Sequence, residues 1–269
     1  MTKIIDVKNM TFKYNDKTIL NDISFSVEEG KWVSIVGPNG SGKSTLVRIL
    51  TGLLGESEDI TICGMPLIKK NFYEIRKSIG MVFENPDNNL LGETVLDDLS
   101  IILENLYYEE DIIDRETKKV LKAFDIEHLK DVNSNNLSGG EKQKVALAAA
   151  MIHTPKIIIL DEAIEMIDDK SRKEILELLK IINRAYNTTI IMVTHDLNEA
   201  LYGDEIILLA NKEILMTGNK LDCLKEEAIF KKLGFELPFM IDLSSKLRSY
   251  GLVSDVILDM NEMVNTLWQ

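Results

Sequence analysis

The sequence predicts an α/β fold with a mostly parallel core sheet and an antiparallel β flank. Short, uninterrupted apolar runs rich in β-branched residues alternate with longer segments that have helical spacing. This is the pattern of a parallel sheet covered by helices. Near the N-terminus, apolar and polar residues alternate instead, as they do in antiparallel strands. The length of 269 residues allows a main domain of about 200 residues and a smaller unit.

The expected core strands are the five apolar runs at 31–37, 78–83, 156–160, 188–194 and 204–210. The expected helices are the segments with helical spacing at 43–52, 94–107, 111–124, 139–152, 170–186 and 196–202. Antiparallel strands are expected over 9–30 and a hairpin over 209–220. From about Glu226 the pattern becomes helical again, after the sheet should be complete. We therefore expect a main domain over 1–225 and a C-terminal extension over 226–269.

Composition limits the classes of function. The net charge of −13 repels phosphate backbones, so no nucleic-acid partner is expected. No run reaches the roughly 18 apolar residues of a membrane-spanning helix. The N-terminal segment "MTKIIDVKNM" has no apolar stretch of the signal-peptide kind. Cys63 and Cys223 lie far apart, which favours a reduced, cytosolic protein over a disulfide framework.

The segment "GPNGSGKST" follows an expected strand, opens an expected helix and matches the phosphate-loop pattern GxxxxGK[ST]. Backbone N–H groups of such a loop cradle the β- and γ-phosphates, and the helix directs its positive end at them. Lys43 adds a positive charge, and the Ser44 hydroxyl is placed to bind Mg²⁺. The residues expected to bind the nucleotide are Gly37, Asn39, Gly40, Ser41, Gly42, Lys43, Ser44 and Thr45. The sequence therefore predicts a nucleoside triphosphate site.

The strand "KIIILDE" supplies the carboxylates that such a site needs. Its apolar residues end at Asp161, which is expected to hold Mg²⁺ together with Ser44. Glu162 follows at the exit of the strand, beside the expected position of the γ-phosphate. There it could polarise the attacking water as a general base.

A second anion site is expected in "NLSGGEKQKVALAAAMI", residues 136–152. Ser138, Gly139 and Gly140 open an amphipathic helix, and a hydroxyl with exposed amides at a helix N-terminus binds anions. Two separate anion sites in one chain favour an arrangement of two subunits. Each nucleotide would then lie between the phosphate loop of one copy and the Ser-Gly-Gly segment of another.

Taken together, these motifs make residues 3–225 resemble an ATP-binding cassette (ABC) ATPase. Residues 37–45 resemble its Walker A loop, 157–162 its Walker B strand, 137–141 its LSGGQ motif, 165–169 its D-loop and 193–196 its switch-histidine segment. The resemblance implies the P-loop NTPase fold of this family, with a helical subdomain over about 84–152. It also implies a head-to-tail dimer that closes on two ATP molecules with Mg²⁺ and reopens after hydrolysis. His195 would contact the γ-phosphate, and Tyr14 would stack on the adenine.

Two further segments are similar to the ATPases of energy-coupling-factor importers, which power the uptake of vitamins and transition-metal ions. These are "NPDNN" with the following "ETVLDDL", and the terminal "LGFELPFMIDLSSKLRSYGL" over 233–252. The resemblance implies a peripheral subunit on the cytoplasmic face of the membrane. Its partners would be a second ATPase subunit, the same or related, held partly by 226–269, and a transmembrane coupling subunit reached through Glu84–Asn89. A substrate-binding membrane subunit would complete the complex.

Three departures from the family pattern raise the question of whether both ATP sites of a dimer work equally. Glu84 stands where the family has a glutamine, and its carboxylate is expected to bind Mg²⁺ without offering an N–H donor. Glu141 replaces the last glutamine of the LSGGQ motif, at a position expected to point away from the phosphate. Ile164 and Glu165 replace small hydroxyl residues.

Other classes of function remain open. The chain could serve another class of ABC importer, or be a non-transport ABC ATPase of DNA repair or translation. The latter would be expected to show paired cassettes, a coiled-coil insertion or a basic face, and the sequence shows none of these. A plain P-loop kinase or GTPase would lack the Ser-Gly-Gly segment. A GTPase would also need a guanine-reading NKxD segment, which "NKEI" at 211–214 does not supply.

Overall fold

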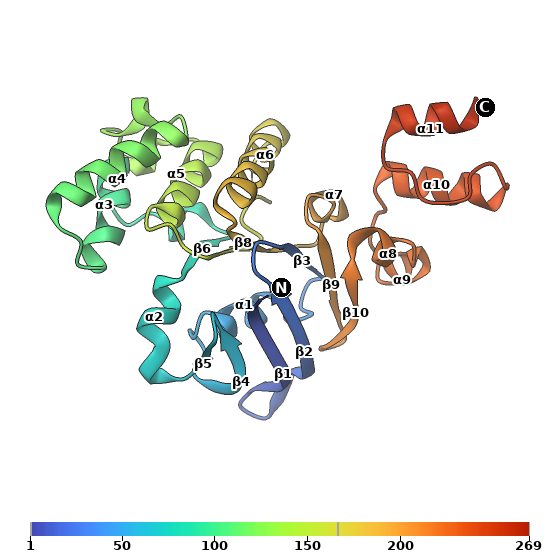
Figure 1. Ribbon diagram of the computed structural model, residues 1–269, viewed down its shortest axis with the longest axis horizontal. Coiled ribbons are helices and arrows are strands. Elements are labelled where there is room, and N and C mark those ends of the chain that lie inside the picture. The colour runs from blue at the N-terminus through green and yellow to red at the C-terminus, as the bar shows by residue number, and fades with distance from the viewer. Residues whose placement is uncertain (1, 166, 269) are drawn as a thin grey trace.

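The computed structural model describes residues 2–165 and 167–268 and contains two β-sheets with helices between and around them (Figure 1). The core sheet has six strands in the order β10-β9-β3-β8-β7-β6. Their bounds are Glu213–Asn219, Glu205–Ala210, Trp32–Val36, Thr189–Thr194, Ile157–Asp161 and Ile79–Phe83. All neighbouring strands of this sheet are parallel except β10, which runs antiparallel to β9. The predicted parallel core is confirmed.

The second sheet is antiparallel and has the strand order β2-β1-β4-β5. The bounds are Lys17–Glu28 for β2, Lys3–Tyr14 for β1, Ser57–Ile62 for β4 and Met65–Leu67 for β5. The β1–β2 hairpin was expected from its alternating pattern, whereas the β4–β5 hairpin was not predicted. Helix α1 (Lys43–Leu50) contributes Leu46, Val47, Ile49 and Leu50 to the hydrophobic cluster that joins the two sheets.

Helices cover the opposite face of the core sheet. They are α3 (Val95–Asn105), α4 (Glu110–Ala123), α5 (Gly139–Met151) and α6 (Asp169–Tyr186), with the short α7 (Leu197–Ala200) after β8. Ile158 and Leu160 of β7 pack toward this layer, whereas Ile157 and Ile159 pack toward α1, as strand alternation requires. Helices α3, α4 and α5 lie together beyond β6 (Figure 1). Between β5 and β6 lies the unpredicted α2 (Phe72–Lys77).

Four 3₁₀ segments complete the connections of the main body, at Lys69–Asn71, Pro86–Asn88, Glu127–Leu129 and Ser134–Asn136. Within 2–165 and 167–268, no helix is both long and apolar enough to cross a bilayer.

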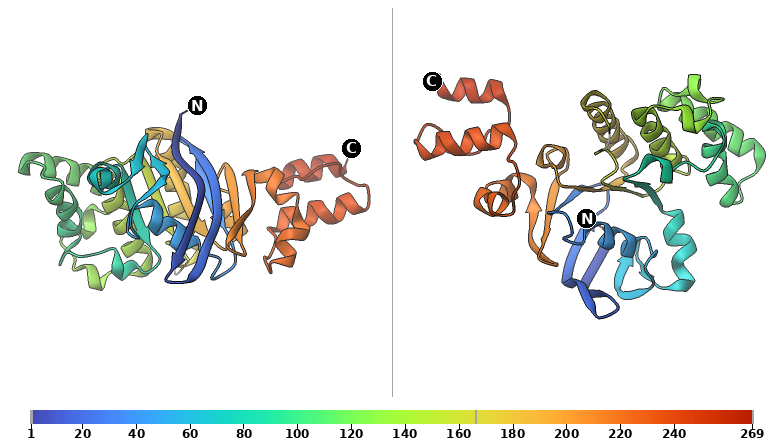
Figure 2. Two further views of the ribbon diagram at one scale, coloured as in Figure 1. Left: turned by 90° about the horizontal axis from the view of Figure 1, so that it is seen from below. Right: turned by 180° about the vertical axis from the view of Figure 1, so that it is seen from behind.

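The C-terminal helices project from the edge of the core sheet that carries β9 and β10 (Figure 2). They are α8 (Lys220–Leu224), α9 (Glu227–Lys232), α10 (Phe239–Ser249) and α11 (Met260–Leu267), so the expected helical pattern is confirmed. Phe230 and Ile241 pack in one cluster with Leu208 of β9. Val253, Ile257 and Met263 form a separate small cluster at the tip. The division at 225/226 stays a prediction.

We expect Phe230→Ala to lower the free energy of unfolding by about 3–5 kcal/mol, because it empties a fully buried site at the base of the C-terminal helices. Phe239 provides a matched control, since its side chain is 65% exposed. Phe239→Ala should change stability by less than about 0.5 kcal/mol. Urea unfolding followed by circular dichroism measures both. Equal losses in the two variants would show that Phe230 does not anchor these helices.

Candidate active site

The phosphate loop leaves the end of β3 and enters α1 through glycines that its geometry requires. Gly42 has a φ of +106°, a left-handed conformation that favours glycine. Gly37 lies so close to β9 that a Cβ atom there would stand 2.2 Å from the carbonyl oxygen of Leu209. Any side chain at Gly37 would therefore push the loop away from the sheet. Asn39 and Gly40, at the tip of the loop, are exposed.

Lys43 begins α1, and its side chain is only 4% exposed. Its Nζ donates a hydrogen bond of 2.8 Å to the carbonyl oxygen of Gly37 and lies 3.1 Å from Oε1 of Glu162. A buried ammonium group needs such partners, since taking it out of water unpaired is very costly. The loop and the end of β7 are thus joined through one lysine.

Asp161 is the last residue of β7 and is buried. Burial raises the pKa of its carboxyl group, the Ser44 hydroxyl lowers it, and the neighbouring charges of Glu162 and Glu84 raise it. Its Oδ1 is buried and has no hydrogen-bond partner among the described residues. A buried carboxylate oxygen without a partner, beside a serine hydroxyl, fits the ligands of a hard divalent cation.

Glu162 adopts a left-handed φ of +52°, and its N–H donates to the carbonyl oxygen of Val193 in β8 at 3.2 Å. This bond joins the exits of two neighbouring parallel strands. His195 follows β8 directly and is 42% exposed. Glu162, Glu165 and His195 each offer one ligand atom, and these atoms lie within 4.8 Å of one another. The carboxylates and the imidazole therefore share one small space.

Ser138 is the N-cap of α5, where it forms a reciprocal capping box with Glu141. The Glu141 carboxylate accepts hydrogen bonds from the Ser138 N–H at 2.8 Å and from the Ser138 hydroxyl at 2.6 Å. These bonds lower the pKa of Glu141. We expected this side chain to point away from the anion site. It instead binds the N–H and the hydroxyl of Ser138, and that hydroxyl is one of the donors that we expected an anion to use.

The structure gathers five of the expected residues at the carboxyl ends of β3, β7 and β8, which is where ligands bind in open α/β sheets. These residues are Lys43, Ser44, Asp161, Glu162 and His195. Their individual roles stay predictions.

Other expected residues lie at the margins. Glu84 is exposed at the exit of β6, next to β7. Tyr14 is 43% exposed at the end of β1, where its ring packs edge-on against Phe12. No hydrogen bond or ion pair joins Ser138–Gly140 to the phosphate loop in the described parts of the chain. Within one chain, the two expected anion sites are thus separate.

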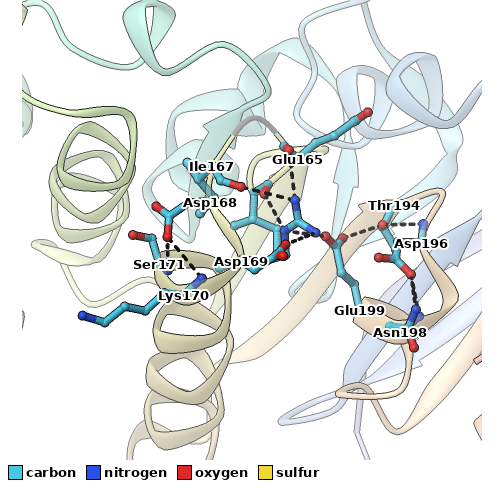
Figure 3. A network of polar contacts seen from close by, with 12 residues as sticks. Glu165, Ile167, Asp168, Asp169, Lys170, Ser171, Thr194, Asp196, Asn198 and Glu199 are labelled. Atoms are coloured by element: carbon cyan, nitrogen blue, oxygen red, sulfur yellow. Dashed lines mark hydrogen bonds and ion pairs between the residues drawn. The ribbon is translucent and has the colours of Figure 1, made fainter. Parts of the chain in front are cut away.

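Arg172 is a residue that our reading of the sequence missed. Its guanidinium donates hydrogen bonds to the carbonyl oxygens of Ile164, Glu165 and Ile167, in the turn after β7. It also lies 3.6 Å from the carboxylate of Glu199, whose Oε2 accepts a hydrogen bond from Thr194 (Figure 3). The sequence did contain a signal for this residue, because Arg172 lies in the first turn of the helix that follows the Walker B strand.

Comparisons with known proteins agree with this geometry. Residues 20–165 match the ABC transporter family. The energy-coupling factor transporter ATP-binding protein EcfA of Pediococcus pentosaceus is 42% identical, over 97% of this chain and 95% of that protein. EcfA1 of Streptococcus sanguinis is 39% identical, over 100% of this chain and 98% of that protein.

Solved structures give the same result. CbiO1 of Clostridium perfringens, described as part of an ABC transporter complex, superposes with a TM-score of 0.77 and 32% identity. The match covers 91% of this chain and all of CbiO1. A dimeric ATP-binding cassette in a post-hydrolysis state with ADP and phosphate gives a TM-score of 0.70 and 30% identity. It covers 80% of this chain and 98% of that chain.

These matches confirm the predicted ABC ATPase fold and the predicted function, an ATP-hydrolysing subunit of an energy-coupling-factor importer. The chain therefore belongs to the ABC transporter family and, within it, to the ATP-binding proteins of energy-coupling factor transporters.

Proposed function

We propose that this subunit hydrolyses ATP at a composite site, between its own phosphate loop and Ser138–Gly140 of a second ATPase subunit. The observation that carries the proposal is the buried Lys43 ammonium beside Glu162, at the mouth of a glycine loop that ends on a helix. The separate position of the capped Ser138 supports the second part. A site divided between two subunits would use both sets of donors. The matched cassette that is a dimer supports the same arrangement.

In the proposed mechanism the nucleotide phosphates replace the Glu162 carboxylate as the partner of Lys43. Phosphate oxygens satisfy a buried ammonium at least as well as a carboxylate does. Glu162 is then released at the exit of β7, where it accepts a proton from the attacking water. His195, from the neighbouring strand exit, contacts the γ-phosphate, and Tyr14 stacks on the adenine. The exchange of partners at Lys43 would thereby couple ATP binding to the release of Glu162 as a general base.

Mg²⁺ is the proposed metal. Ser44 and Asp161 would hold it, because the Ser44 hydroxyl acts on the Asp161 carboxyl group, whose Oδ1 has no partner among the described residues. Glu84 would add a third oxygen from the exit of β6, and its charge already acts on Asp161. A bound Mg²⁺ neutralises charge on the phosphate oxygens during transfer.

The proposed contact with the transmembrane coupling subunit lies along Glu84–Asn89. A cavity of about 730 Å³ opens beside this segment, between α2, β6, α3 and α5. Its lining combines apolar side chains with the basic Arg76 and Lys77, and Asn89 forms part of its wall. Such a groove would receive a helix of a membrane subunit and hold this chain peripherally on the cytoplasmic face. A substrate-binding membrane subunit and contact between ATPases through 226–269 complete the proposed assembly.

Glu162→Gln tests the proposed base. The amide cannot accept the proton, so ATP turnover should fall by roughly 10²-fold or more. ATP binding should persist, because Lys43 loses a competing negative charge. Turnover is measured by phosphate release and binding by a fluorescent ATP analogue. Glu177→Gln, which neutralises an exposed carboxylate on α6, is the matched control and should leave both unchanged. Normal turnover in Glu162→Gln would remove Glu162 from this role.

Glu84→Gln tests the proposed third metal ligand. Loss of the charge should raise the Mg²⁺ concentration for half-maximal ATP turnover by roughly 10-fold, the size of effect seen when the surroundings of a metal are altered. Glu93→Gln removes an exposed carboxylate in the next segment of the chain and serves as control. An unchanged Mg²⁺ requirement in Glu84→Gln would contradict the assignment.

Glu141→Gln tests whether the capping carboxylate opposes nucleotide at the second anion site. The amide keeps an acceptor for Ser138 but removes a negative charge that the partner's γ-phosphate would meet. We expect the KM for ATP to fall about two- to five-fold, the range of exposed charge interactions. The difference should shrink at roughly 1 M salt, because such interactions are screened. Glu110→Gln, in the first turn of α4, is the control. A KM that stays the same in Glu141→Gln would contradict this account.

A further inference from the structure

The turn after β7 carries a carboxylate beside the switch histidine. Oε2 of Glu165 lies 3.6 Å from Nδ1 of His195, the separation of an ion pair. Both side chains are 42% exposed, so neither is locked by burial. His195 also lines a cavity of about 510 Å³, together with Pro38 and Asn39 of the phosphate loop and with residues 233–236. The imidazole thus lies beside a carboxylate and borders a cavity that the first part of the phosphate loop also lines.

Glu165 is held in place by its backbone. The turn that carries it is clasped by Arg172, which binds the carbonyl oxygens of Ile164, Glu165 and Ile167 at 3.2–3.3 Å. The N–H of Glu165 donates to the carbonyl oxygen of Glu162 at 3.2 Å. A guanidinium that binds three carbonyl groups fixes the course of a turn that is otherwise outside any helix or strand.

The turn that carries His195 is fixed independently. The Thr194 hydroxyl donates to Glu199 at 2.5 Å and accepts the N–H of Asp196 at 2.9 Å (Figure 3). Asp196 in turn caps α7 through the N–H of Asn198. Glu199 lies 3.6 Å from Nε of Arg172, so the two turns are connected through a single arginine. Their relative position is therefore set by side chains on both sides of the Glu165–His195 pair.

We propose that Glu165 is a positioning residue for His195, holding its Nδ1–H so that Nε2 faces the γ-phosphate. In a protonated imidazole both nitrogens are donors, and one N–H can reach Glu165 while the other reaches a phosphate oxygen. A carboxylate that orients a catalytic imidazole is a common arrangement in enzymes. The inference rests on the proposed contact of His195 with the γ-phosphate.

The test is a double-mutant cycle in the full-length chain. ATP turnover is measured against ATP concentration for the wild type, Glu165→Ala, His195→Ala and the double variant. We expect Glu165→Ala to lower kcat about 5- to 30-fold and to change KM less than about 3-fold, because a misoriented group costs rate more than binding. In the His195→Ala background the same change should alter kcat less than about 2-fold.

Two further variants sharpen the result. Glu165→Gln keeps the side-chain length and removes the charge, so it should lower kcat by a smaller factor and again have no effect without His195. Glu177→Ala removes an exposed carboxylate on α6 and should leave turnover unchanged. Thermal unfolding of each variant checks folding, and Glu165→Ala should unfold at the wild-type temperature.

The outcomes distinguish the positioning role of Glu165 from the proposed contact of His195 with the γ-phosphate. If His195→Ala lowers turnover but Glu165→Ala does not, the positioning role is overturned while the proposed site stands. Equal losses from Glu165→Ala in both backgrounds would also overturn it, since Glu165 would then act on something other than His195. Full turnover in His195→Ala would overturn both the positioning role and the proposed γ-phosphate contact.

Discussion

The site depends on one buried positive charge. Lys43 is 4% exposed, and its ammonium group is matched by the Gly37 carbonyl and the Glu162 carboxylate. Those partners come from the end of β3 and from the exit of β7, two strands that are joined through β8. The 3.1 Å distance between Lys43 Nζ and Glu162 Oε1 therefore depends on how β3 and β7 pair with β8, which lies between them. Both strands are parallel to β8. Because breaking a buried pair is far costlier than exchanging one partner, a triphosphate is well suited to open this contact.

The exit of β7 carries backbone strain that neighbouring groups stabilise. Glu162 is a non-glycine residue in the left-handed region, which costs of order 1–3 kcal/mol. The hydrogen bond from its N–H to Val193 and the clasp of Arg172 on the following turn oppose relaxation. Strained residues that persist in this way cluster at functional sites. The Glu162 side chain that leaves this strained position lies 3.1 Å from the Lys43 ammonium group.

The parts of the fold that the sequence predicted are those governed by local pattern. Runs such as Ile157–Asp161 are buried on both faces and leave a continuous apolar signal. The short hairpin from Ser57 to Leu67 was missed because its alternation is limited to Ile60–Ile62, after two charged residues, and its second strand has only three residues, one of them proline. The phosphate loop could be predicted because its spacing is dictated by the phosphates themselves.

The parts of the site that were not predicted depend on tertiary neighbours or side-chain rotation. Glu165 contacts His195 only because β7 and β8 are neighbouring strands. No local sequence pattern shows which strands are neighbours. The orientation of Glu141 is a different case. Ser138 and Glu141 have the spacing of a capping box, which can be recognised in the sequence. That spacing predicts that the Glu141 side chain folds back on the N-cap residue. The expectation that Glu141 points away from the anion site followed from the resemblance to the LSGGQ motif and not from this spacing.

The capped state of α5 also bears on how two such subunits could meet. Each chain carries a net charge of −13, so two copies repel at long range. At about 0.1 M salt this repulsion is screened beyond roughly 10 Å, which leaves the groups at the contact to decide affinity. The Ser138 donors are already satisfied by Glu141 in the single chain. In the proposed composite site, a partner's phosphate would gain little by replacing one anion with another at those two donors. The free energy of closure would then come mainly from the exchange at Lys43 and from the surfaces around the nucleotide.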